Sequence, residues 1–157
     1  MQIKILQDED FINYKKPAMF ISFPSCTWKC ERDCGKRVCQ NSPLSAIDDI
    51  SVNIEVIINR YINNPITKSI VCGGLEPFDS FNDLLQLISH LRVYTNDDIV
   101  IYTGYNKEEI IDKIEKIIVY KNIIIKYGRF IPDQEKHFDE ILGVHLASDN
   151  QYAEKIS

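Results

Sequence analysis

Four cysteines lie close together in this chain, and their side chains are well suited to metal chemistry. They are Cys26, Cys30, Cys34 and Cys39, whereas a fifth cysteine, Cys72, stands apart. Thiolates are soft ligands, and groups of three or four of them select zinc or an iron–sulfur cluster. A catalytic cluster needs only three protein thiolates when its fourth iron binds a substrate or cofactor. The sequence therefore predicts a metal centre between Cys26 and Cys39 with three or four protein ligands.

The spacing of these cysteines favours an iron–sulfur cluster over zinc. They are separated by three, three and four residues, whereas structural zinc sites usually combine two well-separated pairs of ligands. The histidines, His90, His137 and His145, are all far along the chain. A thiol redox protein would usually carry two cysteines with two residues between them, and this segment has no such pair. Cys72 lies in an apolar run, and we interpret it as a small buried hydrophobic residue.

Alternating patterns along the chain predict the elements that position the cysteines. Strands are expected at 18–23, 69–72, 98–102 and 122–126, with a short one at 143–147, and helices are expected at 52–62, at 81–91 and from Asn106 onward. Ser51 is placed to cap the first helix, and Asn106 with Glu109 suits a capping box. Apolar strands separated by amphipathic helices indicate βα units. We therefore predict an α/β fold, a half (βα) barrel with a mainly parallel sheet, in a single domain over residues 1–157.

Four loops of unusual composition each follow a predicted strand. The cysteine loop follows the first core strand, and the other three contain Gly73-Gly74, Thr103-Gly104 and Tyr127-Gly128. In a parallel sheet the carboxyl ends of all strands lie on one side, where α/β folds place ligands and active sites. We therefore expect these loops to meet at one rim of the sheet and to form one site.

Composition and charge narrow the classes of function. Hydrophobic residues make up 45% of the chain and charged residues 26%, as in ordinary globular proteins. The net charge of −5 argues against a nucleic-acid partner, although the basic residues Lys29, Arg32, Lys36 and Arg37 among the cysteines give that segment a different sign. No apolar run approaches the roughly 20 residues that cross a bilayer, and the N-terminus lacks a signal-peptide core. We therefore expect a cytoplasmic protein with no membrane partner, where clustered cysteines more often bind metal than form disulfides.

With these features, the chain resembles the radical S-adenosylmethionine superfamily, and within it the small activating enzymes of anaerobic (class III) ribonucleotide reductase. The similarity runs from Phe20 to Gln151. In that family a strand leads into a loop with three residues between its first two cluster ligands, as between Cys26 and Cys30. The third ligand is followed closely by an asparagine, as in Cys39-Gln-Asn41, so the residues between Cys30 and Cys39 contain an insertion. The resemblance implies Cys26, Cys30 and Cys39 as ligands and leaves Cys34 as an unligated thiol.

Further segments carry the resemblance along the chain. Gly73-Gly74-Leu-Glu76-Pro is similar to a Gly-Gly-acidic-Pro motif with one residue inserted, and the segments 102–105, 127–130 and 148–151 resemble other strand-end motifs of these activators. In the family, the glycine motif binds the amino group of the methionine part of S-adenosylmethionine. The resemblance thus implies that Glu76 holds this ammonium, with Gly73 and Gly74 beside it and Thr103 as another contact. Glycines let the backbone come close to a ligand, and a carboxylate pairs well with an ammonium.

The resemblance implies a [4Fe–4S] enzyme that reductively cleaves S-adenosylmethionine to methionine and a 5′-deoxyadenosyl radical. The electron would come from a flavodoxin- or ferredoxin-like donor, and no side chain is assigned a catalytic role because the cofactor carries the chemistry. Few residues remain to enclose a small molecule, so the half-open site suits a macromolecule. The resemblance implies a glycyl-radical enzyme such as anaerobic ribonucleotide reductase. The alternative is a non-catalytic iron–sulfur or zinc protein for electron transfer or partner docking, in which all four clustered cysteines are ligands.

Overall fold

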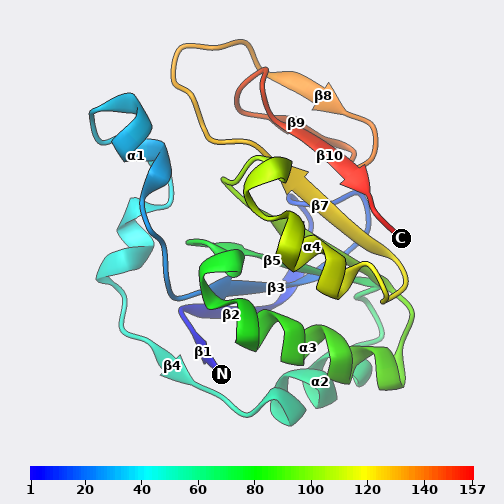
Figure 1. Cartoon of the computed structure of the whole chain (residues 1–157). Coiled ribbons are helices and arrows are strands. Elements are labelled where there is room, and N and C mark those ends of the chain that lie inside the picture. The colour runs from blue at the N-terminus through cyan, green and yellow to red at the C-terminus, as the bar shows by residue number, and fades with distance from the viewer.

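A six-stranded sheet forms the centre of the fold in the computed structural model, which describes residues 1–157 (Figure 1). Its strand order is β10-β7-β6-β5-β3-β2. The four central strands run parallel, and the two edge strands pair antiparallel to their neighbours. In chain order the strands of this sheet are β2 Ile5–Asp10, β3 Ala18–Phe23, β5 Ser69–Gly74, β6 Asp98–Tyr102, β7 Ile123–Tyr127 and β10 Tyr152–Lys155.

The α/β prediction is confirmed, but the sheet is mixed rather than wholly parallel. All four predicted core strands are present. The predicted strand at 143–147 appears as β9 (Val144–Leu146), which pairs with β8 (His137–Asp139) in a separate two-stranded sheet. A third small sheet joins β1 (Gln2–Ile3) to β4 (Ile50–Ser51). The strand order gives an open sheet with an antiparallel strand at each edge, and it does not by itself establish the curvature of the predicted half barrel.

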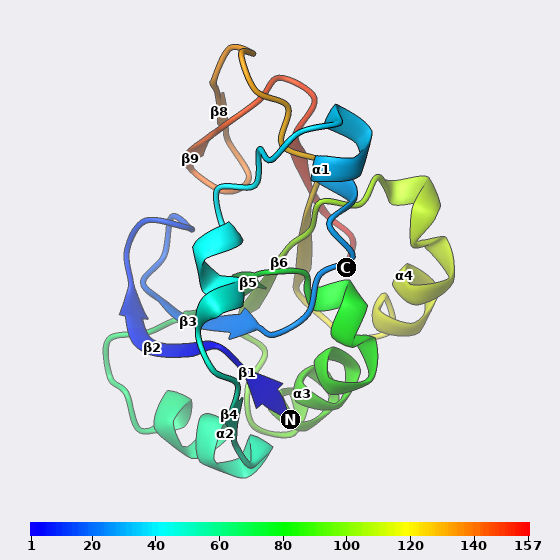
Figure 2. The same ribbon diagram turned by 90° about the vertical axis from the view of Figure 1, so that its left-hand side faces the viewer.

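Three helices pack on one face of the sheet, as Figures 1 and 2 show. They are α2 (Ile54–Ile62), α3 (Phe81–Tyr94) and α4 (Ile111–Ile117), and short 3₁₀ helices lie at η1 (Ser42–Ala46), η2 (Pro77–Ser80) and η3 (Lys107–Glu109). The capping box of Asn106 and Glu109 is confirmed, and it caps η3 just before α4. The cap predicted at Ser51 is wrong, because Ser51 lies in β4 and the side chain of Asn53 accepts the hydrogen bond from Glu55 N instead.

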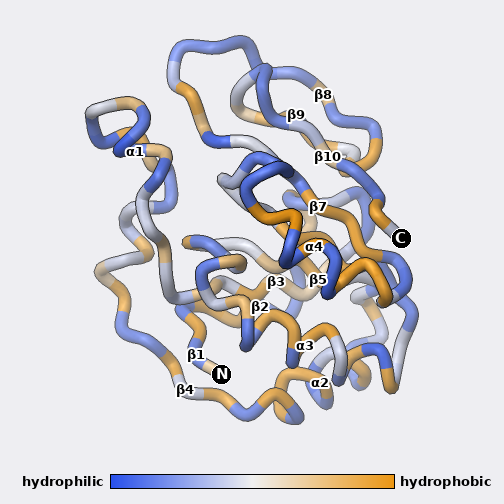
Figure 3. The backbone as a smooth tube through the Cα atoms, viewed as in Figure 1, coloured by the Kyte–Doolittle hydropathy of each residue, from blue (hydrophilic) through white to orange (hydrophobic).

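The sheet is apolar on both faces, which explains why its central strands consist almost entirely of hydrophobic residues. Met19, Ile21 and Phe23 of β3 belong to the larger core under the helices. Neighbouring strand residues that face the other way pack against Tyr14, Leu142 and other side chains from the segments that follow β2 and β7. Figure 3 shows the same distribution, with hydrophobic colour along the strands and hydrophilic colour concentrated in the outer loops. No helix in the structure combines the length and the apolar character that a membrane span requires.

A short helix, α1 (Lys29–Cys34), lies apart from these layers. It was not predicted, and none of its residues is buried. Figures 1 and 2 both show it beyond the end of the sheet, away from α2 and α3. The chain enters α1 at Trp28 and leaves it at Gly35, and both residues have left-handed backbone conformations. The cysteine loop is therefore a compact projection from the end of β3.

Gly74 is the last residue of β5, and its backbone conformation is one that only glycine adopts easily. Its φ is +87°, and a Cβ atom built there would lie 2.0 Å from Ser22 Oγ on the adjacent strand β3. Two effects thus oppose a side chain at this position, the left-handed backbone and the contact with Ser22.

We expect Gly74→Ala to lower the free energy of unfolding by about 3 kcal/mol or more, because backbone strain and overpacking add. Gly35→Ala is the matched control, since Gly35 also has a left-handed φ of +67° but open space around its Cβ position. It should cost only about 1 kcal/mol. Urea unfolding of the metal-free proteins gives both values, and equal losses would contradict the proposed contact with Ser22.

Candidate metal centre

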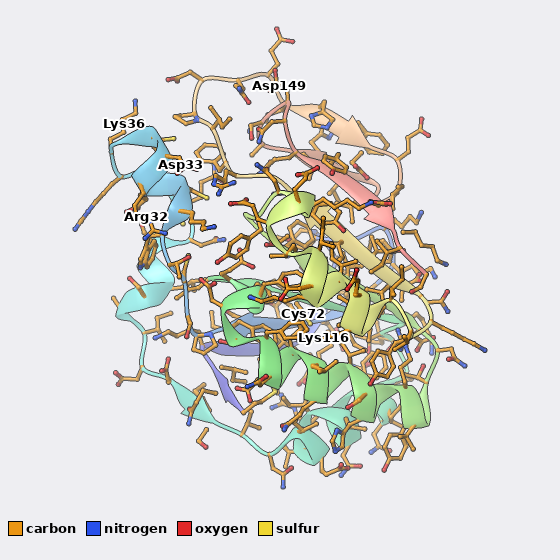
Figure 4. All side chains as sticks on the ribbon, viewed as in Figure 1. Arg32, Asp33, Lys36, Cys72, Lys116 and Asp149 are labelled. Carbon is orange, nitrogen blue, oxygen red and sulfur yellow. The ribbon has the colours of Figure 1, made fainter.

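The cysteine segment places its thiols around the carboxyl end of β3. Cys26 precedes α1, Cys30 and Cys34 lie on α1, and Cys39 precedes η1. All four are free thiols of intermediate exposure. Cys72 is fully buried in β5, as predicted, and Figure 4 shows it in the middle of the fold, well away from α1. The site therefore has four candidate ligands.

The charge of Cys39 acts on two of the other thiols, Cys26 and Cys30. Burial raises the pKa of Cys26 to about 12 and raises the pKa of Cys30, and the negative charge of Cys39 contributes to both shifts. Burial also raises the pKa of Cys39 itself. Hydrogen bonds from the backbone of Trp28 and Phe130 act in the opposite direction on Cys26 and Cys30, because they favour the thiolate. The charge of Cys39 thus opposes ionisation of Cys26 and of Cys30, and a bound metal would supply the compensating positive charge.

The fourth thiol, Cys34, lies on the same cavity as Cys30. It lines a cavity of about 360 Å³ together with Cys30, Asn106, Arg129 and Phe130. No three His, Cys, Asp or Glu side chains of the chain come close enough together to hold a single metal ion. A cluster requires less convergence, because each thiolate binds a different iron. A donor set made only of thiolates suits an iron–sulfur cluster.

Glu76 connects the loops that follow β5 and β6. Its side chain is buried, with 4% of the residue exposed. Thr103 donates its hydroxyl hydrogen to Glu76 Oε1 (2.8 Å), and the Gly104 N–H donates to Oε2 (2.8 Å). The backbone N–H of Phe78 also donates to Oε1 (3.1 Å). The Glu76 N–H in turn donates to the carbonyl of Ser25 at the start of the cysteine loop (2.8 Å).

The side chains of Cys30 and Glu76 both lie close to Gly104. A Cβ atom on Gly104 would lie 3.2 Å from Cys30 Sγ and 3.7 Å from Glu76 Oε2. The negative charge of Glu76 contributes to the raised pKa values of both Cys26 and Cys30. The structure thus brings together the predicted ligand Cys30, the predicted ammonium-binding Glu76 and the loop that contains Thr103.

Asn41 links Gly73-Gly74, at the end of β5, to the cysteine segment. The Asn41 side chain donates from Nδ2 to the carbonyl oxygen of Gly74 (2.9 Å). Asn41 comes two residues after Cys39, so this bond ties the end of the cysteine segment to the end of β5. Hydrogen bonds therefore link three of the four loops predicted to converge, and the Gly128 N–H adds the fourth by donating to Tyr105 O (3.0 Å).

Lys126 is a site residue that sequence reasoning missed. It is buried near the end of β7, and its Nζ donates to Gly128 O (3.0 Å). Burial lowers its pKa to about 8, while the charges of Glu76 and Cys30 raise it. A lysine inside the apolar strand Ile123–Tyr127 was the available signal, because a buried ammonium requires a partner of opposite charge. Lys126 places a positive charge within reach of the otherwise negative site.

Arg129 fastens the cysteine helix to the rest of the rim. Its Nη atoms contact both carboxylate oxygens of Glu109 (2.6 and 2.7 Å), and its Nε lies 2.6 Å from Asp33 on α1. Lys29, at the start of α1, binds the same Glu109 (2.9 Å). Such bidentate pairs are geometrically specific. Arg129 thereby sets the position of α1, which carries Cys30.

The cysteine loop thus projects beside a buried carboxylate at one end of a mixed α/β sheet. Comparison with known proteins indicates which kind of centre such cysteines hold. Residues 18–152 match the model of a family described as a 4Fe-4S single cluster domain. The chain therefore belongs to that family, a domain found in radical SAM-related proteins, and the predicted [4Fe–4S] cluster is supported. No curated protein and no solved structure matches the chain.

Burial raises the pKa of Glu76 from 4.5 to about 7. Because the folded-state pKa lies above the unfolded one, folding favours the protonated form, and this stabilisation is lost as pH rises through about 7. Between about pH 4.5 and 8 the free energy of unfolding of the metal-free protein should therefore fall by about 3 kcal/mol through Glu76.

Glu76→Gln should remove this component of the pH dependence, which urea unfolding at several pH values measures. The exposed Glu135→Gln is the control, and it should keep the wild-type profile. Parallel profiles for Glu76→Gln and the wild type would show that Glu76 is not the titrating group.

Proposed function

We propose that this chain is a radical S-adenosylmethionine enzyme with a [4Fe–4S] cluster held by Cys26, Cys30 and Cys39. When bound, the reduced cluster supplies the electron that cleaves S-adenosylmethionine to methionine and a 5′-deoxyadenosyl radical, which removes a hydrogen atom from a partner. The partner we propose is a glycyl-radical enzyme such as anaerobic ribonucleotide reductase. The four parallel strands with their helices would correspond to half of a (βα) barrel.

The observation that carries this proposal is that Cys30 Sγ and Glu76 Oε2 both lie within 4 Å of the position that a Cβ atom would take on Gly104. A cluster that only transfers electrons gains nothing from a buried carboxylate beside its thiolates, because the like charges repel one another. A cofactor with an ammonium group changes this balance, since the carboxylate then faces a positive charge beside the cluster. Burial of Glu76 strengthens that attraction by excluding water.

The hydrogen bonds around Glu76 leave room for such a ligand. A carboxylate offers about four acceptor sites, and three are used, by Thr103, Phe78 and Gly104. Oε2 accepts only one of these bonds, so it retains an acceptor site for an ammonium. The Thr103 hydroxyl donates its single hydrogen to Glu76 and accepts a hydrogen bond from Tyr105 N (3.0 Å), so it has no hydrogen left to donate to a ligand. We therefore propose that Thr103 supports the cofactor by orienting Glu76.

The remaining rim residues have supporting roles in this proposal. Gly73 and Gly74 let the β5 loop approach the ligand, and Asn41 fixes the Gly74 carbonyl. Lys126 offsets the negative charge of Glu76 and the thiolates. The projecting cysteine loop leaves its thiols partly exposed, so a large partner is able to complete the wall of the site.

Cys34 supports a second candidate function, in which the cluster has four cysteine ligands. It lies four residues after Cys30 on α1, and both line the same cavity. If Cys34 bound the fourth iron, the cluster would be closed to S-adenosylmethionine. The chain would then carry electrons or dock a partner.

Alanine substitution of each cysteine separates the two functions. The proteins are reconstituted anaerobically with iron and sulfide and reduced with dithionite in the presence of S-adenosylmethionine. Cys26→Ala, Cys30→Ala and Cys39→Ala should lower release of 5′-deoxyadenosine by more than about 100-fold, since even supporting residues of metal sites contribute 10- to 100-fold. Cys34→Ala should retain wild-type iron content and activity within about twofold. Equal loss of iron from all four variants would favour the closed cluster.

A further inference from the structure

The backbone on both sides of Cys26 is held by the segment that follows β5. On one side the Glu76 N–H donates to the Ser25 carbonyl oxygen (2.8 Å). On the other side the Thr27 N–H donates to Asp79 Oδ2 (2.6 Å), and Asp79 lies in η2, directly after the Glu76 turn. Two hydrogen bonds to one short segment therefore fix both peptide groups that flank the proposed ligand Cys26.

Tyr105 holds Asp79 in the position that this contact requires. Tyr105 is buried just after β6, and its hydroxyl donates to Asp79 Oδ1 (2.5 Å). The Thr27 hydroxyl lies 3.3 Å from the Tyr105 hydroxyl oxygen and donates to it, because the single Tyr105 hydrogen is used for Asp79. Lys29 Nζ lies 4.5 Å from the centre of the Tyr105 ring, in a cation–π contact. Tyr105 thus contacts both Asp79 and the cysteine loop.

The loop fixed in this way directs a backbone N–H group at the Cys26 sulfur. The Trp28 N–H donates to Cys26 Sγ (3.2 Å). Trp28 has a left-handed φ of +56°, which is uncommon for a bulky residue, so contacts outside the loop must maintain its shape. Thr27, whose N–H binds Asp79, immediately precedes Trp28. Asp79 and Tyr105 therefore maintain the conformation in which Trp28 N–H reaches Cys26.

This conformation affects how readily a cluster on Cys26 accepts an electron. Hydrogen bonds to the sulfurs and the local net charge both set the reduction potential of a cluster. An N–H that donates to a ligand sulfur stabilises the reduced, more negative state. The charge of Asp79 has the opposite effect, and it contributes to the raised pKa of Cys26. Because the Tyr105 hydroxyl donates to Asp79, it both preserves the N–H···S bond and partly offsets that charge.

We propose that Asp79 and Tyr105 are positioning residues for the cluster, which hold the Trp28 N–H against Cys26 Sγ and thereby raise the reduction potential of the cluster. This inference rests on the proposed role of Cys26 as a ligand, but it does not require cleavage of S-adenosylmethionine. In the test below, one electron passes from Ti(III) citrate, which is oxidised to Ti(IV), and converts [4Fe–4S]²⁺ to [4Fe–4S]⁺. No proton is transferred.

The test variant is Tyr105→Phe, which removes the hydroxyl and keeps the ring beside Lys29. The matched control is Tyr61→Phe, since the Tyr61 hydroxyl also donates to a carboxylate, Asp97 Oδ2 (2.6 Å). Tyr61 lies on α2, away from the cysteine loop (Figure 1). Both variants and the wild type are reconstituted with iron and sulfide and titrated with Ti(III) citrate without S-adenosylmethionine. The electron paramagnetic resonance signal of [4Fe–4S]⁺ then gives each reduction potential.

Tyr105→Phe should shift the one-electron equilibrium about tenfold toward the oxidised cluster, which lowers the potential by about 59 mV, because a charge-assisted hydrogen bond is lost. Tyr61→Phe should keep the wild-type potential, although it loses a hydrogen bond of the same kind. An unchanged potential in Tyr105→Phe would overturn the proposal, and so would an equal shift in Tyr61→Phe.

Trp28 provides a second measurement that needs no cluster. It is the single tryptophan of the chain, so its fluorescence anisotropy in the metal-free protein reports the mobility of the loop. The anisotropy should fall in Tyr105→Phe and stay at the wild-type value in Tyr61→Phe. Equal anisotropy in all three proteins would contradict the positioning role, and this comparison decides the case in which Tyr105→Phe binds no cluster.

Cys26→Ala distinguishes failure of this inference from failure of the proposed function. If Cys26→Ala keeps the wild-type iron content, Cys26 is not a ligand, and the inference fails together with the proposed ligand set. If Cys26→Ala loses iron and Tyr105→Phe keeps the wild-type potential, the inference alone fails. A wild-type protein that releases no 5′-deoxyadenosine would contradict the proposed reaction and leave the comparison of potentials in force.

Discussion

The carboxylate of Glu76 and the donors around it determine the arrangement of the whole rim. Its oxygens accept hydrogen bonds from the β6 loop at Thr103 and Gly104, and its backbone N–H binds the cysteine loop at Ser25. Burial makes this arrangement costly, as the pKa of about 7 shows. The hydrogen bonds of Glu76 join the loops, but burial disfavours its ionised form. The arrangement is understandable if the carboxylate receives a positively charged ligand, and this is the basis of the proposed function.

The cysteine loop poses a related electrostatic problem, which the chain solves with positive charge. Three neighbouring thiols with raised pKa values need compensation before they ionise. The iron atoms of a bound cluster would provide most of it, and Lys126 adds positive charge from β7. Arg129 holds the loop from outside by binding Asp33 and Glu109. The loop is therefore positioned by ion pairs rather than by a hydrophobic core, consistent with the absence of buried residues in α1.

The sequence predicted the central part of the fold and the convergence of the site. The strands at 18–23, 69–72, 98–102 and 122–126 are buried on both faces, so their apolar runs were clear. The edge strand Ile5–Asp10 was not predicted because it is half-exposed and rich in acidic residues. The helix α1 was not predicted because it has no apolar face. Lys126 and Arg129 could not be identified as site residues from sequence, since their roles depend on partners on other strands and loops. The roles of Cys26, Cys30, Cys39 and Glu76 as ligands to cluster and cofactor remain predictions.

The most direct test of this account is electron paramagnetic resonance of the reduced, reconstituted protein with and without S-adenosylmethionine. A [4Fe–4S]⁺ signal that changes when the cofactor is added is expected, because one iron is free to bind the cofactor. Glu76→Gln should weaken the change while leaving the signal of the cofactor-free cluster in place. A cluster signal that is indifferent to S-adenosylmethionine in the wild type would contradict the account and indicate a closed site with four cysteine ligands.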